Sequence, residues 1–225
     1  MEAEAIWLTL RLAATTTVLL LTGALPLAWW IARGTGLSRS LVQATVALPL
    51  VLPPTVIGFY LLIGLGPVTA FGKAVTILLG HPLAFSFTGL VVGSLLYSLP
   101  FAVQPLVAGF QSIDPGYFEA ASGIGMSPGQ QFRSVALPMA GTSILTSAVL
   151  TFTHTVGEFG VVLMVGGNIP GVTRTLSIAL YDRVQDGDYA VAGHISLMLL
   201  AFSLLALGAI YIFSGLQPKR LMDGR

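Results

Sequence analysis

The sequence contains no cysteine and very few charged residues. Ten Lys and Arg residues and nine Asp and Glu residues make up 8% of its 225 positions, whereas 55% of the positions are hydrophobic. Soluble globular domains carry about 25% charged residues, so the composition argues against a water-soluble enzyme, and the same hydrophobicity excludes a disordered chain. Without cysteine the protein has no disulfides, no thiolate nucleophile and none of the common zinc sites.

A nucleic-acid partner is excluded on charge. The net charge is only +1 and is spread thinly along the chain, whereas a protein that neutralises a phosphate backbone carries a dense basic stripe. The chain is therefore predicted to be held by packing within membrane lipid.

Long uncharged runs predict membrane-spanning helices. An ionised side chain at the centre of a bilayer costs about 2.5 to 3.5 kcal/mol, and crossing the hydrocarbon core takes about 20 residues. The sequence predicts an all-α integral membrane protein with five spans, near residues 6–31, 41–64, 85–109, 138–163 and 190–214. The prolines of segment 48–54 predict a broken second span. Residues 65–84 are expected to form a short re-entrant or surface helix, with a sixth span as the alternative.

The basic residues predict which ends of the spans face the cytoplasm, because cytoplasmic loops carry an excess of Lys and Arg. One set of loops contains Arg33, Arg39, Arg133, Lys219, Arg220 and Arg225. The other set contains Lys73, Arg174 and Arg183. This difference predicts an N-terminus outside the cytoplasm and a C-terminus inside. No basic stretch precedes the first span, so we expect this span to be retained rather than cleaved as a signal peptide.

A polar segment, residues 112–138, lies between the third and fourth predicted spans. Asp114 is a favourable N-cap and Pro115 a favourable first helical residue. Gly125 can end the helix in a left-handed conformation. These signals predict a short cytoplasmic helix over residues 115–124.

A second helix is expected to follow the first at once. Ser127 and Gln130 have the spacing of a capping box, and the helix is predicted to run toward Pro138. Three aromatic or small side chains of the first helix are expected to face the cytoplasm with nothing else in the chain to cover them: Tyr117, Phe118 and Ala121. An uncovered surface of this kind suggests docking to a partner.

The loop carries a longer pattern. Glu119-Ala120-Ala121 is followed by Gly125 and then by Val135-Ala136-Leu137-Pro138. This spacing resembles the EAA loop of ABC importer permeases, with Val135 in place of the usual Ile. The resemblance implies that the loop forms a coupling helix, which sits in a groove of a separate ATP-binding subunit and converts closure of that subunit into movement of the spans. The residues to which it assigns this role are Tyr117, Phe118, Glu119, Ala120, Ala121, Gly125, Leu137 and Pro138.

The chain is expected to be a non-catalytic transport subunit. No G-x-x-x-x-G-K-[ST] phosphate loop occurs in the sequence, so ATP hydrolysis is expected to require a separate subunit. No cofactor and no metal site are expected.

Further blocks resemble the permease subunit of molybdate importers. They cover residues 48–58, 156–160 and 166–177, and the likeness extends over residues 5–215. Tungstate and sulfate permeases are relatives with similar blocks, so these ions remain alternatives.

This resemblance implies a permease fold and a set of partners. The chain would be a single permease domain over residues 1–225, with the coupling loop at 112–138, in the bacterial cytoplasmic (inner) membrane. A second copy of the chain would complete the pathway, with two ATP-binding subunits inside. A periplasmic or lipid-anchored substrate-binding protein would deliver the oxyanion from outside.

The candidates for the pathway or its gate are Glu158, Asn168 and Arg174. Arg174 lies on the predicted outer side, where it could face an oxyanion, and the alternative is a Gly-Pro turn that ends the fourth span. An ionised Glu158 in the pathway would repel an anion. We therefore expect a gate or structural role for Glu158, either near the outer interface or hydrogen-bonded across helices.

His154 and Glu158 suggest a rival function, because residues four apart share a helix face. The two could relay protons in a proton-coupled secondary transporter, although this interpretation leaves the EAA loop unexplained. A metalloenzyme would need further ligands, and the H-E-x-x-H motif is absent from the sequence.

Overall fold

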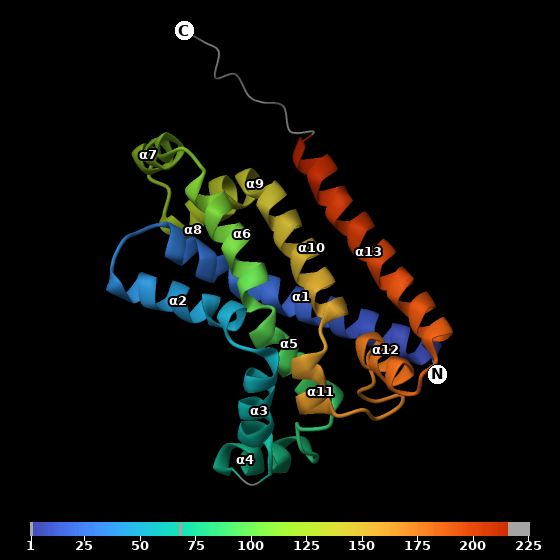
Figure 1. The fold of residues 1–225 in the computed structure, drawn as a ribbon. Coiled ribbons are helices and arrows are strands. Elements are labelled where there is room, and N and C mark those ends of the chain that lie inside the picture. The colour runs from blue at the N-terminus through green and yellow to red at the C-terminus, as the bar shows by residue number, and fades with distance from the viewer. Residues whose placement is uncertain (1, 68, 216–225) are drawn as a thin grey trace.

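In the computed structural model, which describes residues 2–67 and 69–215, the regular elements are all helices (Figure 1). Lys219, Arg220 and Arg225, and with them the predicted position of the C-terminus, lie outside the described residues. In chain order the helices are α1 (Glu2–Ala32), α2 (Leu37–Val51), α3 (Pro54–Leu65), α4 (Ala70–Leu79), α5 (Phe87–Tyr97), α6 (Leu99–Gln111), α7 (Pro115–Gly123), α8 (Pro128–Gln131), the π-helix η1 (Phe132–Ala136), α9 (Leu137–Met139), α10 (Gly141–Gly157), α11 (Gly160–Gly166), α12 (Leu176–Gln185) and α13 (Tyr189–Gly215).

The candidate spans in the structure are of two kinds, single long helices and bent pairs of shorter helices. α1 and α13 are each long and apolar enough to cross a membrane alone. Three further candidates are pairs of helices joined at a bend: α2 with α3, α5 with α6, and segment Pro128–Met139 with α10. If each pair is one span, the described residues contain up to five spans, the number that the uncharged runs predict. The assignment of inside and outside stays a prediction.

The second predicted span is broken at its prolines. α2 ends at Val51 and α3 begins at Pro54, and the two axes differ by 109°. Pro53 and Pro54 have no backbone N–H with which to continue the hydrogen bonds of α2. The third span bends by 41° at Ser98, shortly before Pro100.

The fourth predicted span, residues 138–163, is not one continuous helix. Segment Pro128–Met139 meets α10 at an angle of 74°. α10 then ends at Gly157, and Glu158 and Phe159 separate it from α11. Glycines flank this second break on both sides, and glycine in a helix costs about 1 kcal/mol relative to alanine.

Residues 65–84 contain the short helix that the sequence predicts. Thr69 caps the first turn of α4, since its Oγ1 accepts a hydrogen bond of 2.9 Å from the Gly72 N–H. The helix ends at Gly80, whose φ is 76°. Its 10 residues are too few to cross the hydrocarbon core. Figure 1 places α4 at the end of the molecule opposite α7.

The main core lies where α1, α6 and α10 pack together. Its buried side chains include Leu20, Ala28, Leu106 and Phe110. Elsewhere, α3 and α11 approach closely at a glycine, because a Cβ atom added to Gly58 would lie 2.6 Å from the Met164 Cβ atom.

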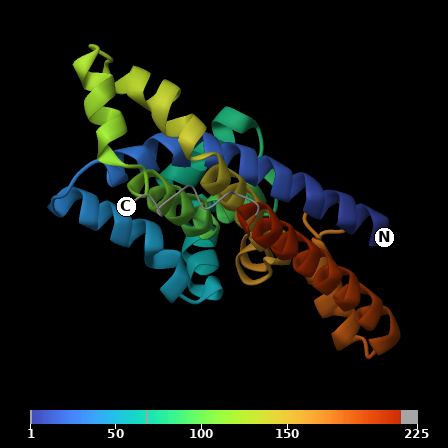
Figure 2. The same cartoon turned by 90° about the horizontal axis from the view of Figure 1, so that it is seen from above.

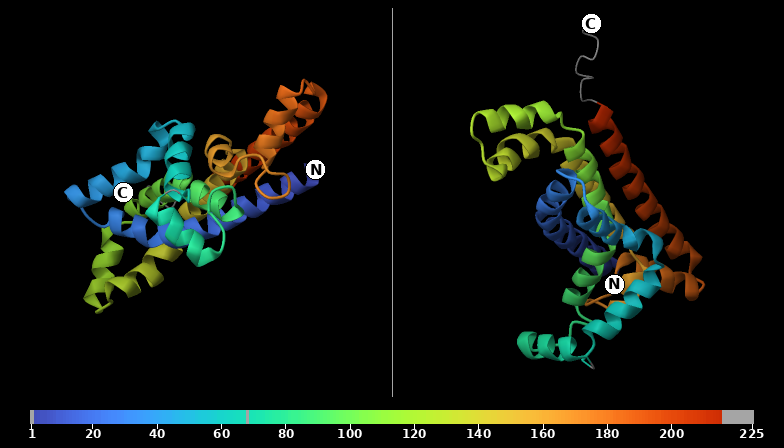
Figure 3. Two further views of the ribbon diagram at one scale, coloured as in Figure 1. Left: turned by 90° about the horizontal axis from the view of Figure 1, so that it is seen from below. Right: turned by 90° about the vertical axis from the view of Figure 1, so that its left-hand side faces the viewer.

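α7, segment Pro128–Met139 and α13 lie at the edges of the bundle. Figure 2 and Figure 3 show α7 and segment Pro128–Met139 as a pair of helices that projects from the bundle, whereas α13 lies along its side. Large apolar side chains of α13 are exposed, among them Leu197, Leu204, Leu205 and Tyr211. A helix with such a surface is expected to face lipid.

Candidate functional sites

α7 begins and ends as the sequence predicts. A carboxylate oxygen of Asp114 accepts a hydrogen bond of 2.7 Å from the Gly116 N–H and so caps the first turn. Gly125 has a φ of 80°. Its N–H donates to the Ser122 carbonyl, and the N–H of the following residue donates to the Ala121 carbonyl. These two bonds form a Schellman motif.

The second helix of the loop begins with the predicted capping box. Ser127 Oγ accepts a hydrogen bond from the Gln130 N–H at 3.4 Å, and Gln130 Oε1 accepts one from the Ser127 N–H at 2.8 Å. The helix then widens into η1 just before Pro138, which has no N–H and whose ring crowds the preceding turn of an α-helix. Leu137 packs against the main core, and Pro138 is exposed.

One expectation about α7 was wrong, because the chain itself covers Phe118 and Ala121. The ring of Phe118 lies 5.4 Å from the ring of Trp29 in α1, and Ala121 is only 5% exposed. Trp29 and Arg33, at the end of α1, both contact the Phe118 ring and so cover it. Tyr117 is 53% exposed, as expected.

The open face of α7 carries apolar groups. Tyr117, Ala120 and Ile124 are three or four residues apart, so they lie on one side of the helix, and all of them are exposed. Ile124 is the C-cap residue and is 75% exposed. Glu119 is also exposed and, together with Arg33, lines an open cavity of about 640 Å³ beside the helix.

Glu158 is hydrogen-bonded across helices, which is one of the two arrangements expected for it. It follows the last residue of α10 and is 4% exposed. Ser94 Oγ of α5 donates a hydrogen bond of 2.7 Å to Glu158 Oε2. The other carboxylate oxygen, Oε1, is buried without a hydrogen-bond partner among the described residues.

His154 lies one turn before Glu158 and contacts the bend between α5 and α6. Its Nδ1 is 3.0 Å from Ser98 Oγ, and its ring stacks on Phe101 with the ring centroids 3.9 Å apart. Ser98 Oγ also lies 3.0 Å from Thr155 Oγ1. Two polar pairs therefore join the bend of the third span to the end of α10. Residues 2–67 and 69–215 contain no group of three His, Cys, Asp or Glu side chains that could hold a metal ion.

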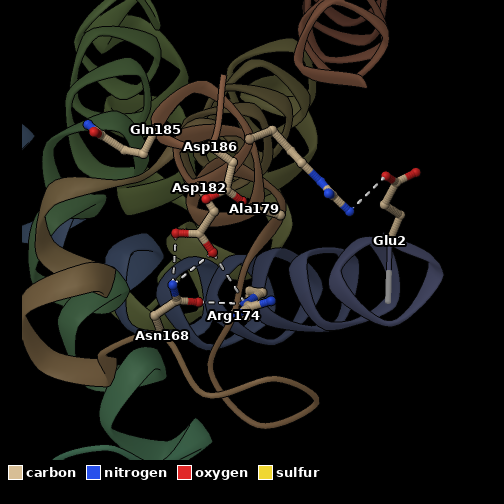
Figure 4. A pocket seen from close by; sticks show the side chains of 8 residues that line it. Glu2, Asn168, Arg174, Ala179, Asp182, Gln185 and Asp186 are labelled. Atoms are coloured by element: carbon tan, nitrogen blue, oxygen red, sulfur yellow. Dashed lines mark hydrogen bonds and ion pairs between the residues drawn. The ribbon is translucent and has the colours of Figure 1, made fainter. Parts of the chain in front are cut away.

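Asn168 and Arg174 do meet, but around an acidic residue that the sequence analysis did not single out (Figure 4). Asn168 Nδ2 donates hydrogen bonds of 2.9 and 2.8 Å to the two carboxylate oxygens of Asp182. Arg174 Nε donates to Asn168 Oδ1 at 2.5 Å and lies 3.6 Å from Asp182 Oδ2. Within the chain, Asp182 thus accepts hydrogen bonds from Asn168 and forms an ion pair with Arg174.

The cavity beside this cluster is mixed in charge. Its volume is about 380 Å³, and its lining includes Glu2, Arg174, Asp182, Arg183 and Asp186. Arg183 also lies 3.8 Å from Glu2, which ties α12 to the start of α1. Three carboxylates among these side chains make the cavity unfavourable for a dianion.

A different groove, between α2 and α6, is polar but uncharged. Its volume is about 450 Å³. The hydrogen-bonding side chains that line it are Ser40, Gln43, Gln104 and Gln111, and small residues separate them. All of these polar side chains are exposed.

Several residues that complete these sites were not singled out from the sequence: Trp29, Ser94, Ser98 and Asp182. The spacing of Ser94 and Ser98 could have indicated their role. They are four residues apart, as His154 and Glu158 are, so each pair lies on one helix face. The contacts of Trp29 join segments far apart in the chain, so no local pattern indicates them.

Comparison with known proteins identifies the family. The family described as the binding-protein-dependent transport system inner membrane component matches residues 24–219. The molybdenum transport system permease protein ModB of Azotobacter vinelandii is 49% identical over 93% of each chain. The sulfate transport system permease protein CysT of Salmonella typhimurium is 32% identical over 87% of this chain and 70% of its own length. A chain of the MetNI methionine ABC transporter, in an inward-facing conformation, shares the fold with a TM-score of 0.70 at 18% identity, over 94% of this chain and 93% of that chain. This chain therefore belongs to the family of binding-protein-dependent transport system inner membrane components, as a non-catalytic, multi-pass permease subunit of the bacterial inner membrane.

Proposed function

We propose that this chain is the permease subunit of an ATP-driven importer that passes molybdate to the cytoplasm. The observation that carries the choice of ion is the 49% identity with a molybdenum transport permease over 93% of both chains. Sulfate is the second candidate, supported by the 32% identity with a sulfate permease. Tungstate, a tetrahedral dianion like molybdate, is a further alternative.

We infer that residues 112–138 form the coupling loop of a single permease domain that spans residues 1–225. The open face of α7, formed by Tyr117, Ala120 and Ile124, is the surface that meets the ATP-binding subunit. Exposed apolar side chains on a projecting helix support this docking role. The working assembly contains two copies of this chain, two ATP-binding subunits and a substrate-binding protein.

The groove between α2 and α6 is our candidate for the inner part of the pathway. Amide groups can hydrogen-bond an oxyanion without holding it by charge. Gln104 lies on α6 about two turns before Gln111, and an amide facing lipid at that depth is unfavourable. We therefore infer that the second copy of the chain covers this groove and that the ion passes along it.

Glu158, Asn168 and Arg174 have other roles in this proposal. Glu158 and Ser94 form a gate contact between two broken spans, and no anion touches them. Asn168 and Arg174 fix the loop after α11 onto α12 through Asp182, so they shape the outer end of the permease without selecting the ion.

A proton-coupled transporter fits the structure less well. His154 and Glu158 each bond to a serine of the third span, an arrangement that a structural hinge explains. The projecting loop helix with its open apolar face has no part in a proton relay.

The test is ATP hydrolysis and uptake by the reconstituted complex of this chain with its ATP-binding subunit. The binding protein would be supplied empty or loaded with molybdate, tungstate or sulfate. We expect the molybdate-loaded form to give the largest stimulation. Equal stimulation by all forms would contradict the choice of ion, and uptake that needs a proton gradient but no ATP would contradict the importer itself.

A further inference from the structure

Trp29 and Arg33, one turn apart at the end of α1, hold the first helix of the coupling loop. The Trp29 ring lies 5.4 Å from the Phe118 ring of α7. The Arg33 guanidinium carbon lies 4.8 Å from the centre of the Trp29 ring and 4.7 Å from the centre of the Phe118 ring. A guanidinium in contact with two aromatic rings is attracted to both through cation–π interactions.

The same two residues also hold the second helix of the loop. The Trp29 ring lies 5.6 Å from the ring of Phe132 in η1. Arg33 Nη1 donates a hydrogen bond of 3.3 Å to Gln131 Oε1 at the end of α8.

Gln131 connects the two loop helices to each other. It is 4% exposed, and its Nε2 donates hydrogen bonds of 2.9 Å to Ser122 Oγ and 3.2 Å to the Met126 carbonyl. Its carboxamide therefore bonds to Arg33 directly after α1, to α7 and to the turn between α7 and α8. A buried amide with partners for both its oxygen and its nitrogen favours one arrangement of these segments.

This cluster reaches the spans through α1. α1 packs along α6 and α10 in the main core, and the loop makes a second contact with the spans where the ring of Phe132 lies 6.1 Å from the ring of Phe110 in α6. A displacement of α7 that keeps the Trp29, Arg33 and Gln131 contacts must move the end of α1 as well.

We propose that Arg33 is a positioning residue, which together with Trp29 links the coupling helix α7 to α1 and so passes motion of the ATP-binding subunit to the first span. This proposal rests on the proposed coupling role of α7. Arg33 acts through Phe118 and Gln131 and touches neither ATP nor the transported ion.

The first experiment compares Arg33→Ala and Arg33→Lys in the reconstituted complex, with uptake and ATP hydrolysis measured together. Arg39→Ala is the matched control, because the cation–π contact of Arg39, at 5.2 Å, is with the neighbouring Trp30 of α1. We expect Arg33→Ala to lower uptake per ATP hydrolysed by about 2-fold to 30-fold, while the complex still assembles. Lysine keeps the charge but lacks the planar stacking surface, so Arg33→Lys should lie between Arg33→Ala and the unchanged protein.

The second experiment measures position directly and needs no activity. The chain has no cysteine, so spin labels can be attached at Gly23→Cys in α1 and Gly123→Cys in α7, where added side chains meet open space. We expect a narrow distance distribution in the purified complex, broadened by Arg33→Ala and unchanged by Arg39→Ala. An unchanged distribution in Arg33→Ala would overturn the proposal, even if that variant transports poorly.

A third variant separates failure of this proposal from failure of the proposed function. Glu119→Lys changes the coupling helix and leaves Trp29 and Arg33 in place. If Glu119→Lys transports normally, the coupling role of α7 is wrong and the proposal falls with it. If Glu119→Lys abolishes uptake while Arg33→Ala keeps normal uptake per ATP, the coupling role stands and the role of Arg33 is wrong.

Discussion

Ser94 Oγ donates a hydrogen bond of 2.7 Å to Glu158 Oε2, and this bond joins α5 to the residue at which α10 ends. The partners lie 64 residues apart in the chain. One turn further, Ser98 and His154 repeat the contact at the bend between α5 and α6. Polar pairs thus hold two interrupted helices together at the level of their interruptions.

Removing the Ser94 hydroxyl should weaken this connection. Ser94→Ala leaves a buried carboxyl group without its hydrogen-bond donor, which costs about 1 to 3 kcal/mol of unfolding free energy. We expect a lower midpoint of thermal unfolding in detergent and altered coupling of uptake to ATP hydrolysis. Ser38→Ala, at an exposed position, is the control. Glu158→Gln with unaltered coupling would count against the gate role.

Gly125 should accept only residues that tolerate its backbone conformation. Its φ of 80° costs an ordinary side chain about 1 to 2 kcal/mol, whereas asparagine adopts this region more readily. Gly125→Asn should therefore retain uptake and Gly125→Ala should lower it. Gly125→Pro, which loses the N–H bonded to Ser122 and cannot adopt a positive φ, should abolish it. Gly123→Ala is the control, because Gly123 lies within the helix and an added Cβ atom meets open space; it should retain uptake. Normal uptake by Gly125→Pro would show that this helix end is not needed for transport.

A charge on the open face of α7 should weaken binding of the ATP-binding subunit. Ile124→Asp buries a carboxylate in the proposed interface, which is unfavourable without a partner. Because Ile124 is exposed in the permease, the same change should alter the unfolding free energy of the isolated chain by no more than about 0.5 kcal/mol. Co-purification with the ATP-binding subunit measures the effect, and Ile124→Leu is the control. Full co-purification of Ile124→Asp would place the interface elsewhere.

The cluster at Asp182 should affect stability rather than choice of ion. Asp182→Asn and Arg174→Ala break the same partly exposed ion pair, whose loss costs about 0.2 to 1 kcal/mol. Neither change should alter the ratio of molybdate to sulfate uptake in a competition assay. A change of that ratio in Arg174→Ala would show that Arg174 takes part in selecting the ion and lies in the pathway.

A negative charge in the groove between α2 and α6 should slow passage of an anion. Gln104→Glu has nearly the shape of the natural side chain but repels a dianion when ionised. We expect reduced uptake with normal assembly and normal binding of the ATP-binding subunit. Gln104→Asn, which keeps an uncharged amide, should transport better than Gln104→Glu, and equal uptake by both would exclude this groove as the pathway.

The sequence predicts those parts of the structure that depend on local chemistry. Absence of charge predicts the apolar helices, the prolines at 53 and 54 predict the sharp break after α2, and Asp114 and Gly125 predict the bounds of α7. Each signal acts within one or two turns of its own residue.

The rest depends on contacts that form only after the chain has folded. The break at Glu158 lies beside Ser94, a residue of another span, and the cover over Phe118 comes from Trp29. Arg174 suggested an anion site because nothing near it in the sequence shows that it donates a hydrogen bond to Asn168 and forms an ion pair with Asp182. A single sequence records which side chains are present but not which ones meet across the fold.

The length of α1 links this protein to the thickness of its membrane. Its 31 residues extend over about 46 Å at 1.5 Å per residue, whereas the hydrocarbon core measures about 30 Å. The helix must tilt or protrude, and its tilt changes with acyl-chain length. Because Arg33 follows the last residue of α1, a thicker or thinner bilayer would shift the attachment point of α7. Lipid composition is then a variable of transport itself, to be held constant whenever variants of this permease are compared.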